Sequence, residues 1–281
     1  MVCMLDGWQS DFSRNWAREG LAAVDLEPGD IQCGHVGNFV GELFAGQGLL
    51  GGFSGLVHPD FDGMPSARHE AACASGSVTI LAATAEIEAG RYDTACVVGL
   101  EMMRSVSGAQ AARNLGSAAW TGHEFQDATY LWLRAFFDPG EEYDRRYGLK
   151  YEHLMEIAQI NFANGKRGPN AQTRGWVFAP DSFTATEYMA IEHLGLTAPG
   201  EAWKAMEDGL IATGGRLPVN PSGRLIGGAH AVGATDVRMA LDGSNEVTGK
   251  AGGYQVEGAR TVQTLNIGGS TTTTVSLVIG R

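Results

Sequence analysis

The chain has 281 residues and a formal net charge of −12, and 44% of its residues are hydrophobic. That length and content suffice for one large core or two smaller ones. The acidic balance argues against nucleic acid or an anionic membrane surface as the main partner. No apolar run is long enough to span a bilayer, so we expect no membrane insertion. Residues 1–12 lack a basic segment followed by a long apolar one, so we expect no signal peptide.

The four cysteines lie far apart, and none belongs to a CxxC pair or to a His/Cys cluster with zinc spacing. We therefore expect no metal site and a reduced, cytoplasmic protein. Cys33 and Cys96 lie in strand-like runs and are expected in the core.

The first part of the chain predicts a strand, a helix and a second strand. Residues 31–40 (IQCGHVGNFV) indicate a buried strand that leads into a glycine-rich loop. The GxGxxG match at 46–51 follows no clean strand, which favours a loop with a short helix over a dinucleotide site. Apolar positions after Cys73 predict a helix that ends at Gly90, and residues 94–103 predict a strand. This order is typical of an α/β protein.

The rest of the chain differs in composition. Residues 105–178 are rich in aromatic and charged side chains and predict an inserted lobe with its own core. Helices are expected at 151–163 and 187–196, and another begins near His230. Residues 262–280 predict a strand, a glycine turn and a strand.

Cys73 is a candidate nucleophile because it directly precedes the predicted helix in the stretch HEAACASGS. A thiolate there would face unpaired backbone N–H groups and the positive end of the helix dipole. That effect, up to ~2 kcal/mol, predicts a thiol pKa near 7 rather than about 8.5. A second group must still take the proton. The alternative is a small, inert core cysteine.

His230 lies in a glycine-rich turn, GGAHAVGATD, just before another predicted helix. Such a histidine is a candidate hydrogen-bond donor to an oxyanion, and an ordinary surface or core histidine is the alternative. Residues 266–269 (NIGG) form a third turn, where glycine allows a backbone N–H to approach a ligand closely.

Together the segments 69–77 (HEAACASGS), 220–236 (NPSGRLIGGAHAVGATD) and 266–270 (NIGGS) resemble the thiolase family. They match its nucleophile loop, its NPSGG…GHPVGATG block and its C-terminal glycine turn. The likeness is greatest to actinobacterial acetyl-CoA acetyltransferases akin to sterol-carrier-type thiolases.

The resemblance implies an α/β protein with a layered αβαβα fold and a pseudo-duplicated core. Residues 1–183 would form the first half, with the inserted lobe at about 105–178, and 184–281 a shortened, incomplete second half. The substrate would be an acyl-CoA thioester, with no permanently bound cofactor. The reaction would be thiolysis of a 3-oxoacyl-CoA or the reverse Claisen condensation. A homo-oligomer, either a dimer or a tetramer, or a complex with a partner subunit is expected.

The resemblance also implies roles for the candidate residues. Cys73 would be acylated and His230 would bind the thioester oxygen. The backbone N–H groups of Cys73 and Gly268 would form a second oxyanion site, with Asn266 beside it.

Candidates for coenzyme A binding are Ser222 in the NPSG turn and the basic residues around RGPNAQTRG, namely Lys166, Arg167 and Arg174. The alternative for these basic side chains is a solvated surface loop.

The chain departs from the family pattern in its second half. The HDCF loop is missing, and its nearest match is PDSF, with Ser182 where the cysteine would be. Asn266 stands where other thiolases carry their second catalytic cysteine. Asp236 replaces a glycine near the helix start, which would favour a protonated His230. These differences predict an internally truncated chain.

Three functional interpretations remain. The first is a thiolase-type acyltransferase, with either full or impaired activity. The second is a non-catalytic acyl-CoA or lipid-binding relative, or a partner subunit that completes another chain. The third is a defective deletion product. A 3-oxoacyl synthase would share the Cys/His pair but fits the histidine loop less well.

Overall fold

The computed structural model describes residues 2–9, 21, 23–168, 184–223, 225 and 229–281. These residues form two compact units, each built from separate stretches of the chain. The first unit comprises Met1–Ala119, His230–Lys250 and Ala259–Arg281, and the second comprises Trp120–Ala229 and Ala251–Gly258. The units divide the chain differently from the predicted halves 1–183 and 184–281, which remain a prediction.

The first unit contains both sheets. Its strands are β1 (Cys33–Gly37), β2 (Ser66–His69), β3 (Ala95–Gly99), β4 (Thr261–Gly268) and β5 (Thr273–Gly280). Its α-helices are α2 (Gly41–Ala45), α3 (Ser75–Glu88), α4 (Gly108–Gly116) and α10 (Val232–Thr248). Its 3₁₀ helices are η1 (Pro28–Asp30), η2 (Leu50–Leu56), η3 (Pro59–Phe61) and η4 (Ala72–Ala74).

Strand β1 is the centre of a parallel sheet with the order β2-β1-β3. Gly34 of β1 pairs with Ser66 of β2 and with Cys96 of β3. All five residues of β1 are buried, as expected of a central strand that is covered on both faces. The predicted strands are confirmed but are shorter than expected. Strand β2 was not predicted, because SARH is short, half-buried and contains no apolar run.

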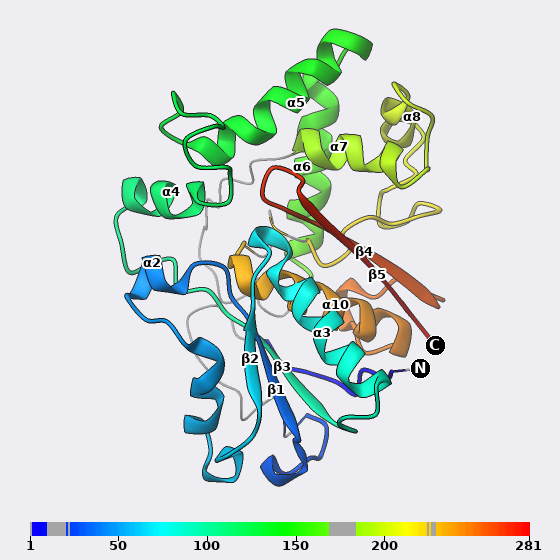
Figure 1. Cartoon of the computed structure of the whole chain (residues 1–281). Coiled ribbons are helices and arrows are strands. Elements are labelled where there is room, and N and C mark those ends of the chain that lie inside the picture. Colours follow the sequence, from blue (N-terminus) through cyan, green and yellow to red (C-terminus); the bar gives the residue numbers. More distant parts are fainter. Residues whose placement is uncertain (1, 10–20, 22, 169–183, 224, 226–228) are drawn as a thin grey trace. The chain divides into compact units, whose positions relative to one another are not determined.

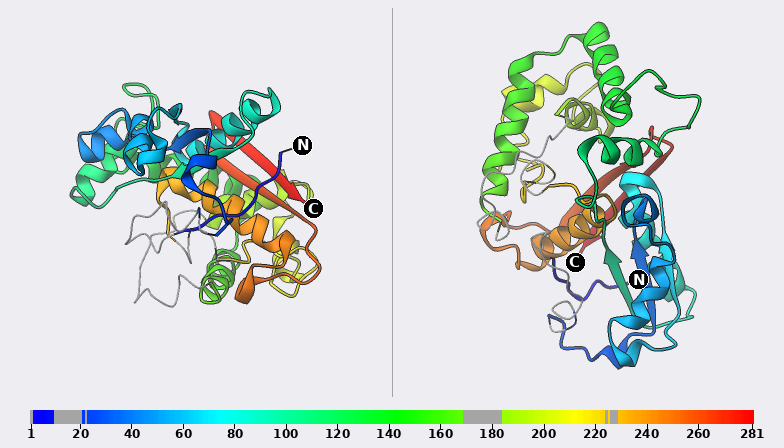
Figure 2. Two further views of the ribbon diagram at one scale, coloured as in Figure 1. Left: turned by 90° about the horizontal axis from the view of Figure 1, so that it is seen from below. Right: turned by 90° about the vertical axis from the view of Figure 1, so that its left-hand side faces the viewer.

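Helices α3 and α10 lie side by side between this sheet and the antiparallel hairpin β4-β5 (Figures 1 and 2). Helix α3 contacts β1 and β3 on one side and β5 on the other, and α10 contacts β3 and β4. This arrangement gives a sheet, a helix layer and a second sheet within the first unit. The predicted strand, glycine turn and strand at 262–280 are confirmed as β4 and β5.

The first turn of α10 approaches the sheet closely because it contains glycine. A Cβ atom on Gly233 would overlap the carbonyl oxygens of Gly37 and Leu100, at the ends of β1 and β3. A Cβ atom on Gly76 of α3 would lie 2.8 Å from the Cβ atom of Asp236. Only glycine at these positions allows the two helices and the strand ends to meet.

The second unit is helical. It contains α5 (Leu131–Tyr147), α6 (Tyr151–Gly165), α7 (Thr184–His193), α8 (Ala202–Glu207) and η5 (Gly252–Tyr254). Its core includes Tyr143, Ile157, Tyr188, Ile191 and Met206, which pack the four α-helices together. The predicted helices at 151–163 and 187–196 are confirmed as α6 and α7.

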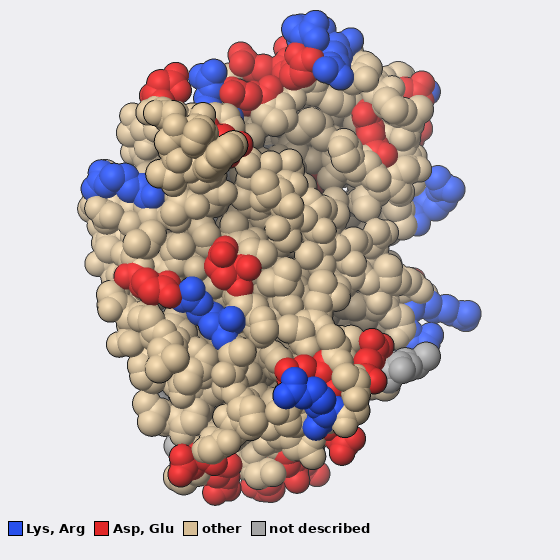
Figure 3. Space-filling model, viewed as in Figure 1, with Lys and Arg blue, Asp and Glu red and all other residues tan. Residues whose placement is uncertain are grey.

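Among the described residues no helix has the length and apolar character needed to cross a bilayer. On the face drawn in Figure 3, Lys and Arg side chains are interspersed with Asp and Glu side chains. This pattern agrees with the acidic net charge of the sequence.

The close contact at Gly233 predicts a large effect of a single methyl group. We expect Gly233→Ala to lower the free energy of unfolding by about 1–3 kcal/mol, because its Cβ atom would overlap two backbone carbonyls. Urea unfolding would measure this change. Gly29→Ala is the control, since its Cβ atom would have no neighbour within 4 Å. Equal stability of the two variants would contradict the prediction.

Candidate active site

Cys73 lies at the centre of η4, the 3₁₀ turn that leads directly into α3. The residue before it, Ala72, has a φ of 48°, which costs a non-glycine residue about 1 kcal/mol. Side chains hold this turn in place. The backbone N–H of Ala72 donates to Glu70 Oε1 at 2.7 Å. Ser75 Oγ accepts from the N–H of Ala71 at 3.0 Å and donates to the carbonyl of Ala72 at 2.6 Å.

The end of β4 lies against the Cys73 turn. The turn expected at residues 266–269 begins only at Gly269, because β4 extends to Gly268. A Cβ atom on Gly268 would overlap the carbonyl oxygen of Ala71 and lie 3.3 Å from the Cβ atom of Ala74. These two alanines flank the stretch that contains Cys73. The end of β4 therefore reaches the Cys73 turn at the closest distance that a backbone allows.

His230 immediately precedes the first turn of α10 and is held there by that turn. Its Nδ1 lies 2.7 Å from Thr235 Oγ1, and the Thr235 hydroxyl donates to the carbonyl of Ala231 at 3.0 Å. Because the hydroxyl uses its one hydrogen on the carbonyl, it accepts from Nδ1–H. In the neutral ring, Nε2 is then the nitrogen that accepts a proton.

The segments of Cys73 and His230 meet in one apolar cluster. Val232, two residues after His230, is buried with Phe39 and Ala72, and Cys73 packs against the same cluster. The fold therefore brings together the segments that carry Cys73 and His230, which are 157 positions apart in the sequence.

Asp236 joins three elements around the Cys73 turn. Its side chain is 1% exposed. Asp236 Oδ2 accepts from the backbone N–H of Ser77, in the first turn of α3, at 3.0 Å. The other oxygen, Oδ1, accepts from the side-chain amide of Asn266 in β4. A carboxylate from α10 thus caps the amino end of α3, a position where the helix dipole stabilises negative charge.

Glu101 has a similar role at the end of β3. Its carboxylate accepts from the backbone N–H groups of Phe39 at 2.7 Å, Val40 at 3.2 Å and Gly233 at 3.2 Å. It also accepts from Asn38 Nδ2 at 3.1 Å. Burial raises the pKa of Glu101, while these hydrogen bonds oppose that rise. Glu101 therefore fixes the loop after β1 to the first turn of α10.

Sequence reasoning missed the structural roles of Asp236 and Glu101. Glu101 follows a predicted strand with no motif around it, and the sequence indicates Asp236 only as a replacement for glycine near a helix start. Their contacts join segments more than 60 and more than 150 residues apart, which no local pattern reveals.

The expected pKa of Cys73 is wrong. Burial raises the pKa of the Cys73 thiol to about 12, and the nearby carboxylates of Asp236 and Glu101 add to the rise. From the sequence, the thiolate of Cys73 is expected to face the positive end of the α3 dipole. In the structure Asp236 already occupies that end, so its negative charge opposes ionisation of the thiol.

The comparisons with known proteins decide the family. The thiolase N-terminal domain matches residues 3–173, and the thiolase C-terminal domain-like family matches residues 176–281. The chain belongs to the thiolase family.

Relatives of this thiolase-family chain include acetyl-CoA acetyltransferases. One from Methanothermobacter thermautotrophicus is 24% identical over 373 aligned positions, which cover 98% of this chain and 96% of the relative. One from Methanocaldococcus jannaschii is 31% identical over 169 residues, covering 59% of this chain and 42% of the relative. Sterol carrier protein 2 from Bos taurus is 39% identical over 88 residues, which cover 31% of this chain and 16% of that relative.

A solved structure supports the same fold. The Ltp2-ChsH2(DUF35) aldolase superposes with a TM-score of 0.67 over 93% of this chain and 90% of its own, at 15% identity. At this identity the likeness shows the fold alone. The predicted α/β, thiolase-like fold is thereby confirmed.

The coenzyme A candidates fall in the second unit of this thiolase-family chain or outside the described residues. Arg174 and Ser182 lie outside the described residues. Lys166, Arg167 and Ser222 belong to the second unit, whereas the Cys73 site belongs to the first. Their role in binding coenzyme A stays a prediction. Cys33 is buried, as expected, whereas Cys96 is only partly buried.

The raised pKa of Cys73 predicts how the thiol reacts. Below about pH 10 its alkylation rate should rise about tenfold per pH unit, because the thiolate fraction grows in that way below a pKa of about 12. Asp236→Asn removes one cause of the rise, so the rate at pH 8 should increase several-fold. Iodoacetamide labelling, with peptide mass spectrometry of Cys73, measures both effects.

A matched control is Glu88→Gln, which removes an exposed carboxylate at the far end of α3. It should leave the alkylation rate unchanged. An alkylation rate that levels off near pH 7 in the unmodified protein would show instead that the Cys73 thiol has a pKa near 7. A rate unaffected by Asp236→Asn would exclude this carboxylate as a cause.

Proposed function

We propose that this chain is a thiolase-type acyltransferase in which Cys73 takes the acyl group from a coenzyme A thioester. The overall reaction is thiolysis of a 3-oxoacyl-CoA or the reverse Claisen condensation. The observation that carries the proposal is the convergence of three segments within the first unit. These are the Cys73 turn, the start of α10 beside His230, and the end of β4 at Gly268.

The state of the resting thiol determines the first step. With its pKa raised to about 12, Cys73 is a neutral thiol at pH 7, so its proton must leave as the S–C bond forms. Because Nδ1–H of His230 donates to Thr235, Nε2 of the neutral ring can accept that proton. The imidazolium holds that proton until the leaving thiolate takes it. Binding of a thioester oxygen, the role that the family resemblance implies for His230, would belong to the carbon–carbon step.

The tetrahedral intermediate would place its oxyanion near the backbone N–H groups of Cys73 and Gly268. Collapse of the intermediate breaks the bond to coenzyme A, whose thiolate takes the proton back from His230. The product is an acyl-Cys73 enzyme and free coenzyme A. Attack by coenzyme A on the acyl-cysteine reverses these steps.

The carbon–carbon step requires a base that removes a proton alpha to a thioester carbonyl. Asn266, at the position of the second cysteine in other thiolases, donates its amide to Asp236 and cannot act as that base. Loss of one acid–base group costs about 10²–10⁴ in rate. We propose that acylation of Cys73 outpaces condensation in this chain by a factor in that range.

The wider expectations are part of the same proposal. The protein acts in the cytoplasm on acyl-CoA, as a homo-oligomer or together with a partner subunit. The alignment with the Methanothermobacter thermautotrophicus relative spans 373 positions against 281 residues here, which supports an internally shortened chain.

A non-catalytic acyl-CoA or lipid-binding protein, or a partner subunit, is the second candidate. The raised pKa of Cys73 favours this alternative, since a neutral, partly buried thiol attacks poorly without a base.

Mass spectrometry after incubation with acetyl-CoA tests the proposal. We expect one acetyl group on Cys73, none in Cys73→Ala and full labelling in Cys96→Ala. His230→Asn should slow acetylation by about 10²–10⁴, because it removes the group that takes the proton. Acetoacetyl-CoA formation, measured in parallel, should be slow in the unmodified chain.

Other outcomes would distinguish the alternatives. A cooperative thermal melt with acyl-CoA binding but no acetylation would support the non-catalytic interpretation. A broad, non-cooperative melt would support a defective deletion product. Acetylation of a cysteine other than Cys73 would contradict the assigned nucleophile.

A further inference from the structure

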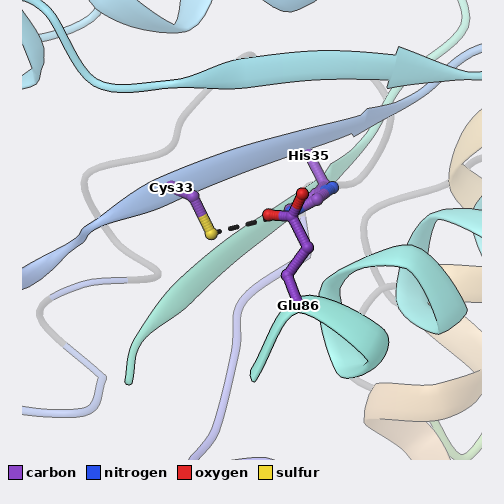
Figure 4. Close-up of side chains that lie close together, drawn as sticks. All are labelled: Cys33, His35 and Glu86. Carbon is purple, nitrogen blue, oxygen red and sulfur yellow. Dashed lines mark hydrogen bonds and ion pairs between the residues drawn. The ribbon is translucent and has the colours of Figure 1, made fainter. Parts of the chain in front are cut away.

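Three side chains with metal-binding atoms converge on the face of the parallel sheet that α3 covers. Cys33 and His35 are two positions apart on β1, so both side chains leave the same face. Glu86, near the end of α3, points at them (Figure 4). The Sγ atom of Cys33 lies 3.6 Å from Nε2 of His35, and that Nε2 lies 3.4 Å from Oε2 of Glu86. All three atoms lie within 4.8 Å of one another.

These separations fit a tetrahedral metal site. Zinc binds cysteine sulfur at about 2.3 Å and histidine nitrogen or carboxylate oxygen at about 2.0 Å. At a tetrahedral angle these bonds place sulfur and nitrogen about 3.5 Å apart, and nitrogen and oxygen about 3.3 Å apart. The observed distances of 3.6 and 3.4 Å agree with both values.

We propose that Cys33, His35 and Glu86 form a binding site for one divalent transition-metal ion, and that Zn²⁺ suits the donor set best. Thiolate, imidazole and carboxylate are the ligands that zinc takes in proteins. The side chains of Cys33 and His35 are buried, whereas that of Glu86 is 29% exposed. An ion can therefore enter from the Glu86 side, where a water molecule completes the coordination.

His69 on the neighbouring strand supports the ligand arrangement. Its Nε2 lies 2.9 Å from Nδ1 of His35, and the two rings stack with centroids 5.1 Å apart. A histidine that binds a metal through one ring nitrogen usually donates its other N–H to a fixed acceptor. Here Nδ1–H of His35 would donate to His69, which directs Nε2 toward Cys33 and Glu86.

Charge balance also favours a divalent ion. A divalent cation bound to one thiolate and one carboxylate makes a neutral group, which a buried site tolerates far better than two anions. Arg91, 3.4 Å from Glu86, is the other charged group beside the cluster and lies at its exposed edge.

The site would join β1 to α3 at the end opposite the Cys73 turn. Glu86 lies near the carboxyl end of α3, and Cys73 directly precedes its amino end. The bound ion would therefore stabilise the helix on which the nucleophile loop depends, without contacting the acyl-transfer site. This inference does not depend on the proposed acyltransferase activity.

Cobalt binding by the full chain tests the site. Co²⁺ bound to a cysteine thiolate gives a charge-transfer band in the near ultraviolet. We expect one equivalent of Co²⁺ to produce that band, and one equivalent of Zn²⁺ to abolish it. Cys33→Ser should lose the band, whereas Cys96→Ser, on the adjacent strand, should keep it. Glu86→Gln should weaken Co²⁺ affinity at least tenfold.

Glu88→Gln, an exposed carboxylate on the same helix, is the matched control and should bind Co²⁺ like the unmodified chain. Should Cys33→Ser fold poorly, the partly exposed Glu86→Gln still reports on the site, compared with Glu88→Gln. Zinc should also raise the melting temperature of the unmodified chain more than that of Glu86→Gln. No thiolate band at equimolar Co²⁺, or equal affinity in the two glutamate variants, would overturn the proposal.

Discussion

The arrangement around Cys73 depends on the hydrogen bonds that the buried carboxylate of Asp236 accepts. The carboxylate accepts from the backbone N–H of Ser77 in α3 and from the side-chain amide of Asn266 in β4. One side chain of α10 therefore fixes both elements that flank the Cys73 turn. A buried carboxylate is stable only when hydrogen bonds replace its lost hydration, and these two contacts supply them. Gly76 in the first turn of α3 and Gly233 in the first turn of α10 make the required close approach possible.

The same carboxylate sets the electrostatics of the site. The positive end of a helix dipole stabilises a negative charge. At the amino end of α3 that charge is the carboxylate of Asp236 rather than a thiolate of Cys73. Burial is the main cause of the raised pKa of the thiol, and the charges of Asp236 and Glu101 add to it. Reaction at Cys73 then depends on proton transfer at the moment of attack. In the proposed acyl transfer, the imidazole of His230, which Thr235 orients, would accept that proton.

Helix α3 connects the Cys73 turn to the proposed metal site. Its amino end follows the Cys73 turn, and its carboxyl end brings Glu86 to Cys33 and His35 on β1. Between these ends the helix is enclosed by the parallel sheet, α10 and β5. The stability of α3 therefore matters to the Cys73 turn and to the proposed metal site.

The sequence alone determined the thiolase-like α/β fold, most helices and strands, and the position of Cys73 just before a helix, because these follow from local patterns and extended motifs. It could not determine the ionisation of Cys73, since Asp236 and Glu101 reach that thiol only through long-range contacts. It also predicted no metal site, because Glu86 comes from a helix more than 50 residues after Cys33 and His35. Only the packing of α3 on β1 brings those three side chains together, and a residue's electrostatic surroundings are set by such packing rather than by its sequence neighbours.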